Sequence, residues 1–169
     1  TKIIHLESVG IRDCPGKDIP SFAKDMGGYC DSFRKEEFSA IKGKGSFLNG
    51  QPIHVSNAEK LSDTMIGLGT AKREVADENF ARFRRVFGQC QDVRRIGSAA
   101  LELAYTACGR QGGYFEIYLN PWDYAAGMLM IQEAGGKVTD FTGKPLEPKK
   151  GSSVVGTNGF IHTELLKLL

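Results

Sequence analysis

Two carboxylates stand in positions where they could do chemistry, Glu116 and Asp123. Asp123 falls in the first turn of a predicted helix over residues 122–134 that is apolar on nearly every side. A charged group there is costly unless something compensates it. Asn120 can cap the helix, and Asp123 can return a hydrogen bond to the backbone of that cap while meeting the positive end of the helix dipole. The alternative is a metal ligand or catalytic acid, and the residues alone leave both roles open.

Glu116 lies on a predicted strand over residues 114–119. Phe115, Ile117 and Leu119 form the apolar row of that strand, so Glu116 belongs to the other row. The strand end and the helix start could bring Glu116 and Asp123 to one sheet edge, where α/β proteins bind ligands. Paired carboxylate oxygens suit Mg²⁺, which prefers hard ligands. A solvated glutamate on an exposed strand face is the alternative.

A third candidate is the turn formed by Gly97, Ser98, Ala99 and Ala100, called the 97–100 turn below. It joins a predicted strand to a predicted helix, so its free backbone N–H groups could receive a phosphate or hydroxyl oxygen. Ordinary capping of the helix by Ser98 explains the same pattern.

Other site types are poorly supported. The three histidines, His5, His54 and His162, are far apart, which favours surface or internally satisfied side chains. There is no Gly-x-Ser-x-Gly elbow and no Walker loop. The cysteines form no CxxC pair and are expected to be reduced thiols in a cytoplasm; they are Cys14, Cys30, Cys90 and Cys108.

The elements that must position these residues alternate between strands and helices. Glycines near residues 43–45 and 49–50 indicate two hairpin turns. Strands are predicted at 64–70, 93–96, 114–119, 138–140 and 153–156, and helices at 77–87, 98–108, 122–134 and from Asn158 onward. This order predicts an α/β fold with a central sheet covered by helices. Residues 1–26 are predicted to be mostly irregular, with a short strand at 3–6.

Composition limits the function classes. The chain has 169 residues, of which 41% are hydrophobic, enough for one globular unit. A formal charge of +2 without a basic run argues against nucleic acid as a partner. No segment approaches a membrane span or a signal peptide, so a cytoplasmic protein is expected.

Several motifs together resemble the second half of the inositol monophosphatase family. They match in order and spacing over roughly residues 27–169. The quoted segments are Gly-Lys-Gly-Ser-Phe-Leu-Asn-Gly at 43–50, Arg-Arg-Ile-Gly-Ser-Ala-Ala-Leu at 94–101, Tyr-Phe-Glu at 114–116, Pro-Trp-Asp-Tyr-Ala-Ala-Gly at 121–127 and Glu-Ala-Gly-Gly at 133–136. The block around Trp122 and Asp123 is the most specific of these.

The resemblance implies a layered, sugar-phosphatase-like α/β fold and hydrolysis of a phosphate monoester with Mg²⁺. It implies a polyol or sugar phosphate as substrate and a homo-oligomer, usually a dimer. In that family the aspartate matching Asp123 binds a metal and a substrate hydroxyl. The 97–100 turn and the glutamate matching Glu116 position the polyol ring.

One departure from the family pattern qualifies these expectations. Family members carry, nearer the amino terminus, a glutamate and an Asp-Pro-x-Asp-Gly-Thr motif that supply the other metal ligands, and no such motif occurs here. Residues 1–26 do not match the family. We therefore expect the carboxyl-terminal part of the fold with an incomplete metal site. Two alternatives remain: an inactive remnant that binds a polyol phosphate or dimerises, and a relative that acts on nucleotide 3′-phosphates or fructose bisphosphate.

Overall fold

The structure is a computed structural model that describes residues 26–31, 33–70 and 73–169. The irregular segment predicted at 1–26 and its strand at 3–6 lie outside the described residues, apart from Met26, at which the first strand begins. The described elements form two sheets and four α-helices, with two short 3₁₀ turns, η1 (Leu61–Asp63) and η2 (Arg73–Val75).

The first sheet is antiparallel and follows the chain order. Its strands are β1 (Met26–Asp31), β2 (Glu36–Ile41), β3 (Gly45–Leu48) and β4 (Gln51–Ile53). Both predicted hairpin turns are present, and their glycines Gly43, Gly45 and Gly50 all have positive φ. Glu133 ties the first of these hairpins to a helix, because its two carboxylate oxygens accept hydrogen bonds from the N–H groups of Gly43 and Gly45 at 2.9 and 3.0 Å.

The second sheet has the order β6-β5-β7-β9-β8. Its strands are β5 (Met65–Leu68), β6 (Asp92–Arg94), β7 (Gly113–Leu119), β8 (Lys137–Thr139) and β9 (Ser152–Thr157). β5 runs parallel to both β6 and β7, whereas β9 is antiparallel to β7 and β8. β7 is therefore the central strand of a mixed sheet.

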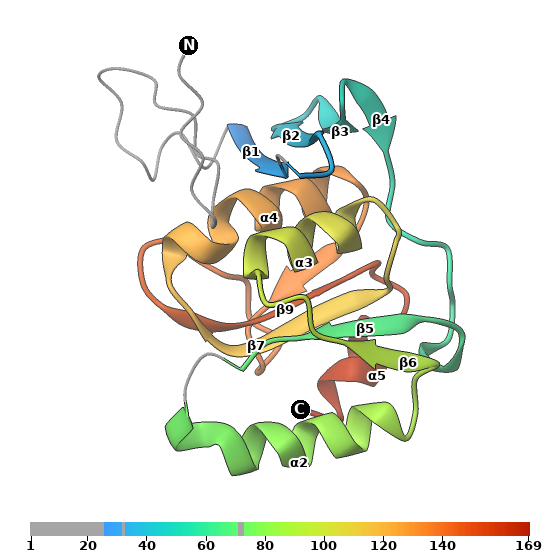
Figure 1. Cartoon of the computed structure of the whole chain (residues 1–169), viewed down its shortest axis with the longest axis vertical. Helices are drawn as coiled ribbons and strands as arrows, with labels where there is room; N and C mark the ends of the chain where they lie inside the picture. The colour runs from blue at the N-terminus through green and yellow to red at the C-terminus, as the bar shows by residue number, and fades with distance from the viewer. Residues whose placement is uncertain (1–25, 32, 71–72) are drawn as a thin grey trace.

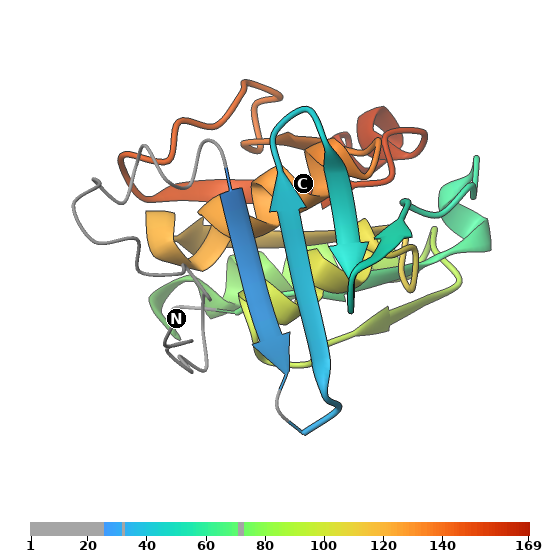
Figure 2. The same cartoon turned by 90° about the horizontal axis from the view of Figure 1, so that it is seen from above.

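The helices complete a layered arrangement (Figure 1). α3 (Ala99–Ala107) and α4 (Pro121–Glu133) lie side by side between the two sheets. α2 (Ala76–Phe87) and α5 (His162–Leu166) cover the opposite face of the five-stranded sheet. Figure 2 looks down on the four-stranded sheet, with the α3–α4 layer beneath it. The α/β layered fold expected from the sequence is confirmed.

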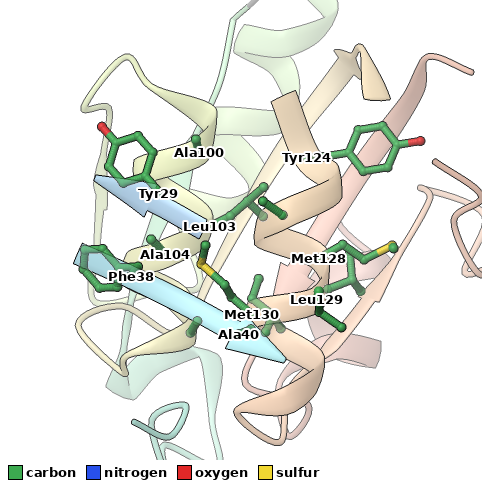
Figure 3. Packing of buried hydrophobic residues seen from close by; sticks show 14 of the residues in the cluster. Tyr29, Phe38, Ala40, Ala100, Leu103, Ala104, Tyr124, Met128, Leu129 and Met130 are labelled. Atoms are coloured by element: carbon green, nitrogen blue, oxygen red, sulfur yellow. The ribbon is translucent and has the colours of Figure 1, made fainter. Parts of the chain in front are cut away.

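Two cores hold these layers together. The larger core lies around α3 and α4, where Leu103, Ala104 and Met130 pack against Phe38 and Ala40 of β2 (Figure 3). The smaller core joins α2 and α5 to the underside of the five-stranded sheet through Val86, Leu165 and Phe115. Consequently β7 has buried side chains on both faces. Neighbouring residues of this strand, Tyr114 and Phe115, belong to different cores.

The predicted elements of the described part are present, with shifts of a few residues at their ends. The last helix differs most: Asn158 accepts a hydrogen bond from the Ile161 N–H at 3.3 Å, and the helix itself begins at His162. Of the cysteines in the described ranges, Cys30, Cys90 and Cys108 are free thiols. Among the described residues, none of the helices has the length and apolar character needed to cross a membrane.

Candidate functional site

A cavity of about 250 Å³ opens where β5 and β6 end. This is the sheet edge at which the sequence places a ligand site, because parallel strands end there together. Its walls come from the end of β5, the 97–100 turn, α3 and β7. The lining residues are Leu68, Gly69, Thr70, Arg95, Gly97, Ser98, Ala99, Glu102, Tyr114 and Glu116.

The 97–100 turn forms one wall of this cavity. Gly97 has a φ of 92°, a conformation that favours glycine, and it turns the chain from β6 into α3. Ser98 is the N-cap of α3, and its hydroxyl accepts a hydrogen bond from the Leu101 N–H at 3.4 Å. Gly97, Ser98 and Ala99 line the cavity, whereas Ala100 is buried in the α3–α4 core. Ser98 thus caps the helix, which is one of the two roles predicted from the sequence, and it also faces the cavity.

Glu116 lies on the opposite wall, within β7. Its side chain is only 6% exposed, so the expectation of a solvated glutamate on an open strand face is wrong. The hydroxyl of Tyr114 donates a hydrogen bond to its carboxylate. The space for both groups exists because Gly69 has no side chain: a Cβ at that position would overlap the Glu116 carboxylate and the Tyr114 hydroxyl.

Asp123 sits beyond this wall, in the first turn of α4. Its Oδ2 accepts hydrogen bonds from the Asn120 backbone N–H at 3.0 Å and from the Asn120 amide at 3.4 Å, which is the predicted capping box. Oδ1 makes no hydrogen bond to any described residue. Asp123 does not line the cavity, but its charge reaches the same wall. Burial raises the pKa of Tyr114 well above its usual value, and the charges of Glu116, Glu102 and Asp123 raise it further.

Glu102 is a site residue that the sequence reasoning missed. It lines the cavity from α3 and is 1% exposed. Its carboxylate accepts hydrogen bonds from the Ile96 N–H at 2.7 Å and from the Gln111 amide at 3.2 Å. The sequence does contain a signal for Glu102: like Asp123, it is a carboxylate in an otherwise apolar helix. Arg95 and Thr70 were missed as well; both line the cavity, and Arg95 Nε donates a hydrogen bond to the Thr70 hydroxyl at 3.1 Å.

Comparison with known proteins identifies the family. The sequence profile of the inositol monophosphatase family matches residues 25–169. This chain belongs to the inositol monophosphatase family. The resemblance expected over residues 27–169 is therefore confirmed, and the matched region is the carboxyl-terminal part of the family fold.

Individual family members agree with this assignment. The inositol-1-monophosphatase of Synechocystis sp. is 40% identical over 155 residues, which cover 90% of this chain and 52% of the relative. The Nus factor SuhB of Escherichia coli K12 is 44% identical over 140 residues, 82% of this chain and 52% of the relative. The inositol monophosphatase structure from Anabaena superimposes with a TM-score of 0.80 at 41% identity, covering 85% of this chain and 57% of that one. The chain thus spans about half the length of the sequence relatives it matches.

The side chains of this inositol monophosphatase homologue do not complete a magnesium site within the described residues. No group of three His, Cys, Asp or Glu side chains in the described ranges could hold a metal ion. Glu116 already accepts a hydrogen bond from Tyr114, and Asp123 offers one oxygen that makes no hydrogen bond to the described residues. A cation that needs several oxygen ligands would have to take the others from outside these residues.

Proposed function

We propose that this chain forms part of a magnesium-dependent phosphatase that hydrolyses the phosphate monoester of a polyol or sugar, such as inositol monophosphate. The observation that carries the proposal is the cavity in which buried Glu116 faces the 97–100 turn at a sheet edge. Family membership supports phosphatase chemistry, and the acidic wall of the cavity supports a hydroxyl-rich substrate. A carboxylate accepts hydrogen bonds strongly, and substrate hydroxyl groups can donate them.

The proposal gives each site residue a role. Glu116 accepts a hydrogen bond from a hydroxyl of the polyol, and Gly97, Ser98 and Ala99 shape the opposite wall. Ala100 supports that wall from the core. Asp123 contributes its remaining oxygen to a magnesium ion and to a substrate hydroxyl, while the other metal ligands come from residues outside the described part. The proposal also includes a homo-oligomer and a cytoplasmic location.

Phosphate release by the purified protein tests this proposal. Inositol monophosphate, a nucleotide 3′-phosphate and fructose bisphosphate are compared at equal concentration, with and without millimolar magnesium. The proposal predicts magnesium-dependent release, with inositol monophosphate as the preferred substrate. Preference for either other ester would favour the nucleotide or fructose bisphosphate alternative. Absence of release from a demonstrably folded protein would favour the inactive remnant that binds a polyol phosphate or dimerises.

A second candidate follows from the SuhB relatives, which are named Nus factors and are 44% identical to this chain in Escherichia coli. Such a role need not depend on hydrolysis. The protein is expressed in an Escherichia coli strain that lacks SuhB, in its wild-type form and with Asp123→Asn. Rescue of the strain by both forms would support a Nus factor role without catalysis, and rescue by the wild type alone would tie the role to the phosphatase site.

A further inference from the structure

Glu102 is the buried acidic residue of the cavity to which the proposed function gives no role. It stands in the first turn of α3, and the absence of a side chain at Gly67 makes room for it, since a Cβ there would overlap its carboxylate. Its side chain reaches back along the chain to the Ile96 N–H at 2.7 Å, and its own backbone N–H donates to the Ser98 carbonyl at 2.9 Å. Glu102 therefore holds the chain on both sides of Gly97.

The segment that Glu102 holds has few other anchors. Ile96 is 43% exposed, so packing of its side chain fixes it weakly. Gly97 has a positive φ and no side chain to pack. The other described contacts nearby are the bond from Arg95 to Thr70, the Ser98 cap, a hydrogen bond between Ser98 and Tyr29, and the packing of Ala99 against the α3–α4 core. Within this wall, the position of Ile96 and Gly97 thus depends on the bond from Ile96 to Glu102.

Burial of a carboxylate at this place carries a free-energy cost. Burial raises the pKa of Glu102, the hydrogen bonds from Ile96 and Gln111 lower it, and the charge of Glu116 raises it again. Glu116 on β7 and Arg95 beside the turn are the charged groups that act on it. In Glu102→Gln the amide oxygen has the same reach and can accept the bond from Ile96, while its NH2 group replaces the oxygen that accepts from the Gln111 amide. The variant therefore tests whether the turn requires the bond to Ile96 or the negative charge.

We propose that Glu102 is a positioning residue that fixes the 97–100 turn at the separation from Glu116 at which the two walls hold a hydroxylated ring. This inference rests on the proposed function, because it assigns to the same cavity the recognition of a polyol. It predicts that loss of Glu102 weakens recognition of the ring and leaves the chemistry at phosphorus unchanged. Glu102 itself does not touch the reacting atoms.

The test compares Glu102→Ala with Glu102→Gln. Affinity for inositol monophosphate is measured by calorimetry, and kcat and KM are measured for inositol monophosphate and for p-nitrophenyl phosphate, which has no polyol ring. Glu102→Ala should weaken binding of inositol monophosphate by about tenfold, the effect of one hydrogen bond. Glu102→Gln should restore most of that affinity. Because p-nitrophenyl phosphate has no polyol ring, kcat and KM for this ester should change less in both variants than those for inositol monophosphate.

Thr106→Val is the matched control. Thr106 is buried in the same helix; its hydroxyl donates to the Glu102 carbonyl at 3.0 Å and accepts from the Gln111 amide at 3.2 Å, and no described hydrogen bond joins it to the turn. The Thr106→Val substitution should lower the free energy of unfolding and leave the affinity for inositol monophosphate unchanged. An equal loss of affinity in Thr106→Val, no restoration by Glu102→Gln, or an equal rise in KM for both esters would overturn the inference.

The failure of this inference can be told apart from the failure of the proposed function. If the wild type hydrolyses p-nitrophenyl phosphate but does not bind inositol monophosphate, the phosphatase chemistry of the proposed function stands, whereas its recognition of this polyol and the role of Glu102 in it are wrong. If the wild type binds inositol monophosphate but hydrolyses neither ester, the proposed function fails, and the three affinities still decide the role of Glu102. If it does neither, both proposals are wrong.

Discussion

At the scale of single residues, the site depends on two glycines as much as on its acidic side chains. Gly67 and Gly69 leave the space that Glu102 and Glu116 occupy above β5. Each carboxylate has polar partners there, Ile96 and Gln111 for Glu102 and Tyr114 for Glu116. This arrangement keeps two acidic groups buried beside a cavity, which would otherwise be costly.

Gly69→Ala should damage the site directly. The added methyl group would overlap the Glu116 carboxylate and the Tyr114 hydroxyl, so both must move. We expect a loss of roughly 1–3 kcal/mol in the free energy of unfolding, as for other overpacked positions. Affinity for inositol monophosphate should fall as well. Chemical denaturation and calorimetry measure the two effects.

Gly88→Ala is the control for Gly69→Ala. The added methyl group there would make only ordinary contacts, at 3.6 Å from the carbonyl oxygens of Arg84 and Arg85. Stability and affinity should stay near the wild-type values. If Gly69→Ala behaves like Gly88→Ala, Glu116 is not held where the structure places it.

Some of these residues could be predicted from the sequence and others could not. The position of Asp123 as the third residue of a capped helix was visible in the order of residue types and is confirmed. The burial of Glu116 was not visible, because alternation along a strand does not show whether the second face meets water or another layer. Glu102 was missed because its partners, Ile96 and Gln111, meet it only through the fold.

At the scale of elements, His162 joins α5 to the edge of the five-stranded sheet. Its imidazole lies between the hydroxyls of Thr139 on β8 and Thr157 on β9, at 3.0 and 2.9 Å. Thr139 donates its own proton to the Asp140 carbonyl, so it must accept from Nε2–H of the ring. The ring is then neutral, with Nδ1 accepting from Thr157. The histidine is thus a satisfied buried side chain, as the sequence suggested.

This histidine should make stability depend on pH. Burial, and then the charge of Lys137, lower the pKa of His162 to about 4. Between its usual value of 6.5 and about 4, the unfolded chain binds a proton that the folded chain does not, so stability falls as pH falls through this window. The effect amounts to about 3 kcal/mol at most, and less if the site relaxes.

Denaturation curves at several pH values test this expectation. Both the wild type and His162→Gln are measured, since glutamine does not titrate while the carboxylates titrate in both. The wild type should lose more free energy of unfolding than the variant between neutral pH and pH of about 4. Equal pH dependence of the two proteins would show that His162 does not remain neutral when folded.

At this scale the sequence predicted the elements better than their surroundings. The amphipathic pattern of α2 and the apolar character of α4 correctly indicated one covering helix and one buried helix. The start of the last helix was set too early, because Asn158 uses its amide to bond the Ala58 carbonyl at 2.8 Å and caps a turn ahead of α5. Such a long-range contact leaves no local signal.

At the scale of the whole molecule, several large apolar side chains of the described part face solvent. Phe33 is 90% exposed, Phe80 64%, Phe160 62% and Trp122 56%. Exposed apolar side chains indicate an interface only where they form a contiguous patch, and these four come from separate parts of the fold. A homo-oligomer remains our prediction on the resemblance to the family. Sedimentation velocity at several concentrations should show a dimer or a larger oligomer, and a monomer at every concentration would contradict it.

Because the chain matches only about half the length of its relatives, its fold accounts for only part of the expected site. The chain covers about half of each sequence relative, and the described residues hold a cavity lined by two buried acids but no complete group of metal ligands. The residue pattern therefore predicted the fold and part of the cavity lining more completely than a group of metal ligands. Substrate choice within one fold depends on a few side chains, and Glu102 and Arg95 of this cavity are among those to examine.

Asp123 is proposed to serve a phosphatase site in addition to capping α4. Asp123→Asn separates these roles, because the asparagine oxygen can still accept the Asn120 N–H while the charge is lost. Asp123→Ala removes both, and should cost about 1 kcal/mol of stability through the lost cap.

The most direct measurement is magnesium-dependent phosphate release from inositol monophosphate by the wild type and Asp123→Asn, each with its free energy of unfolding. We expect near wild-type stability and a rate lowered by roughly 100-fold or more in Asp123→Asn. Release at the wild-type rate by Asp123→Asn would rule out a role in the phosphatase site and leave Asp123 as a helix cap.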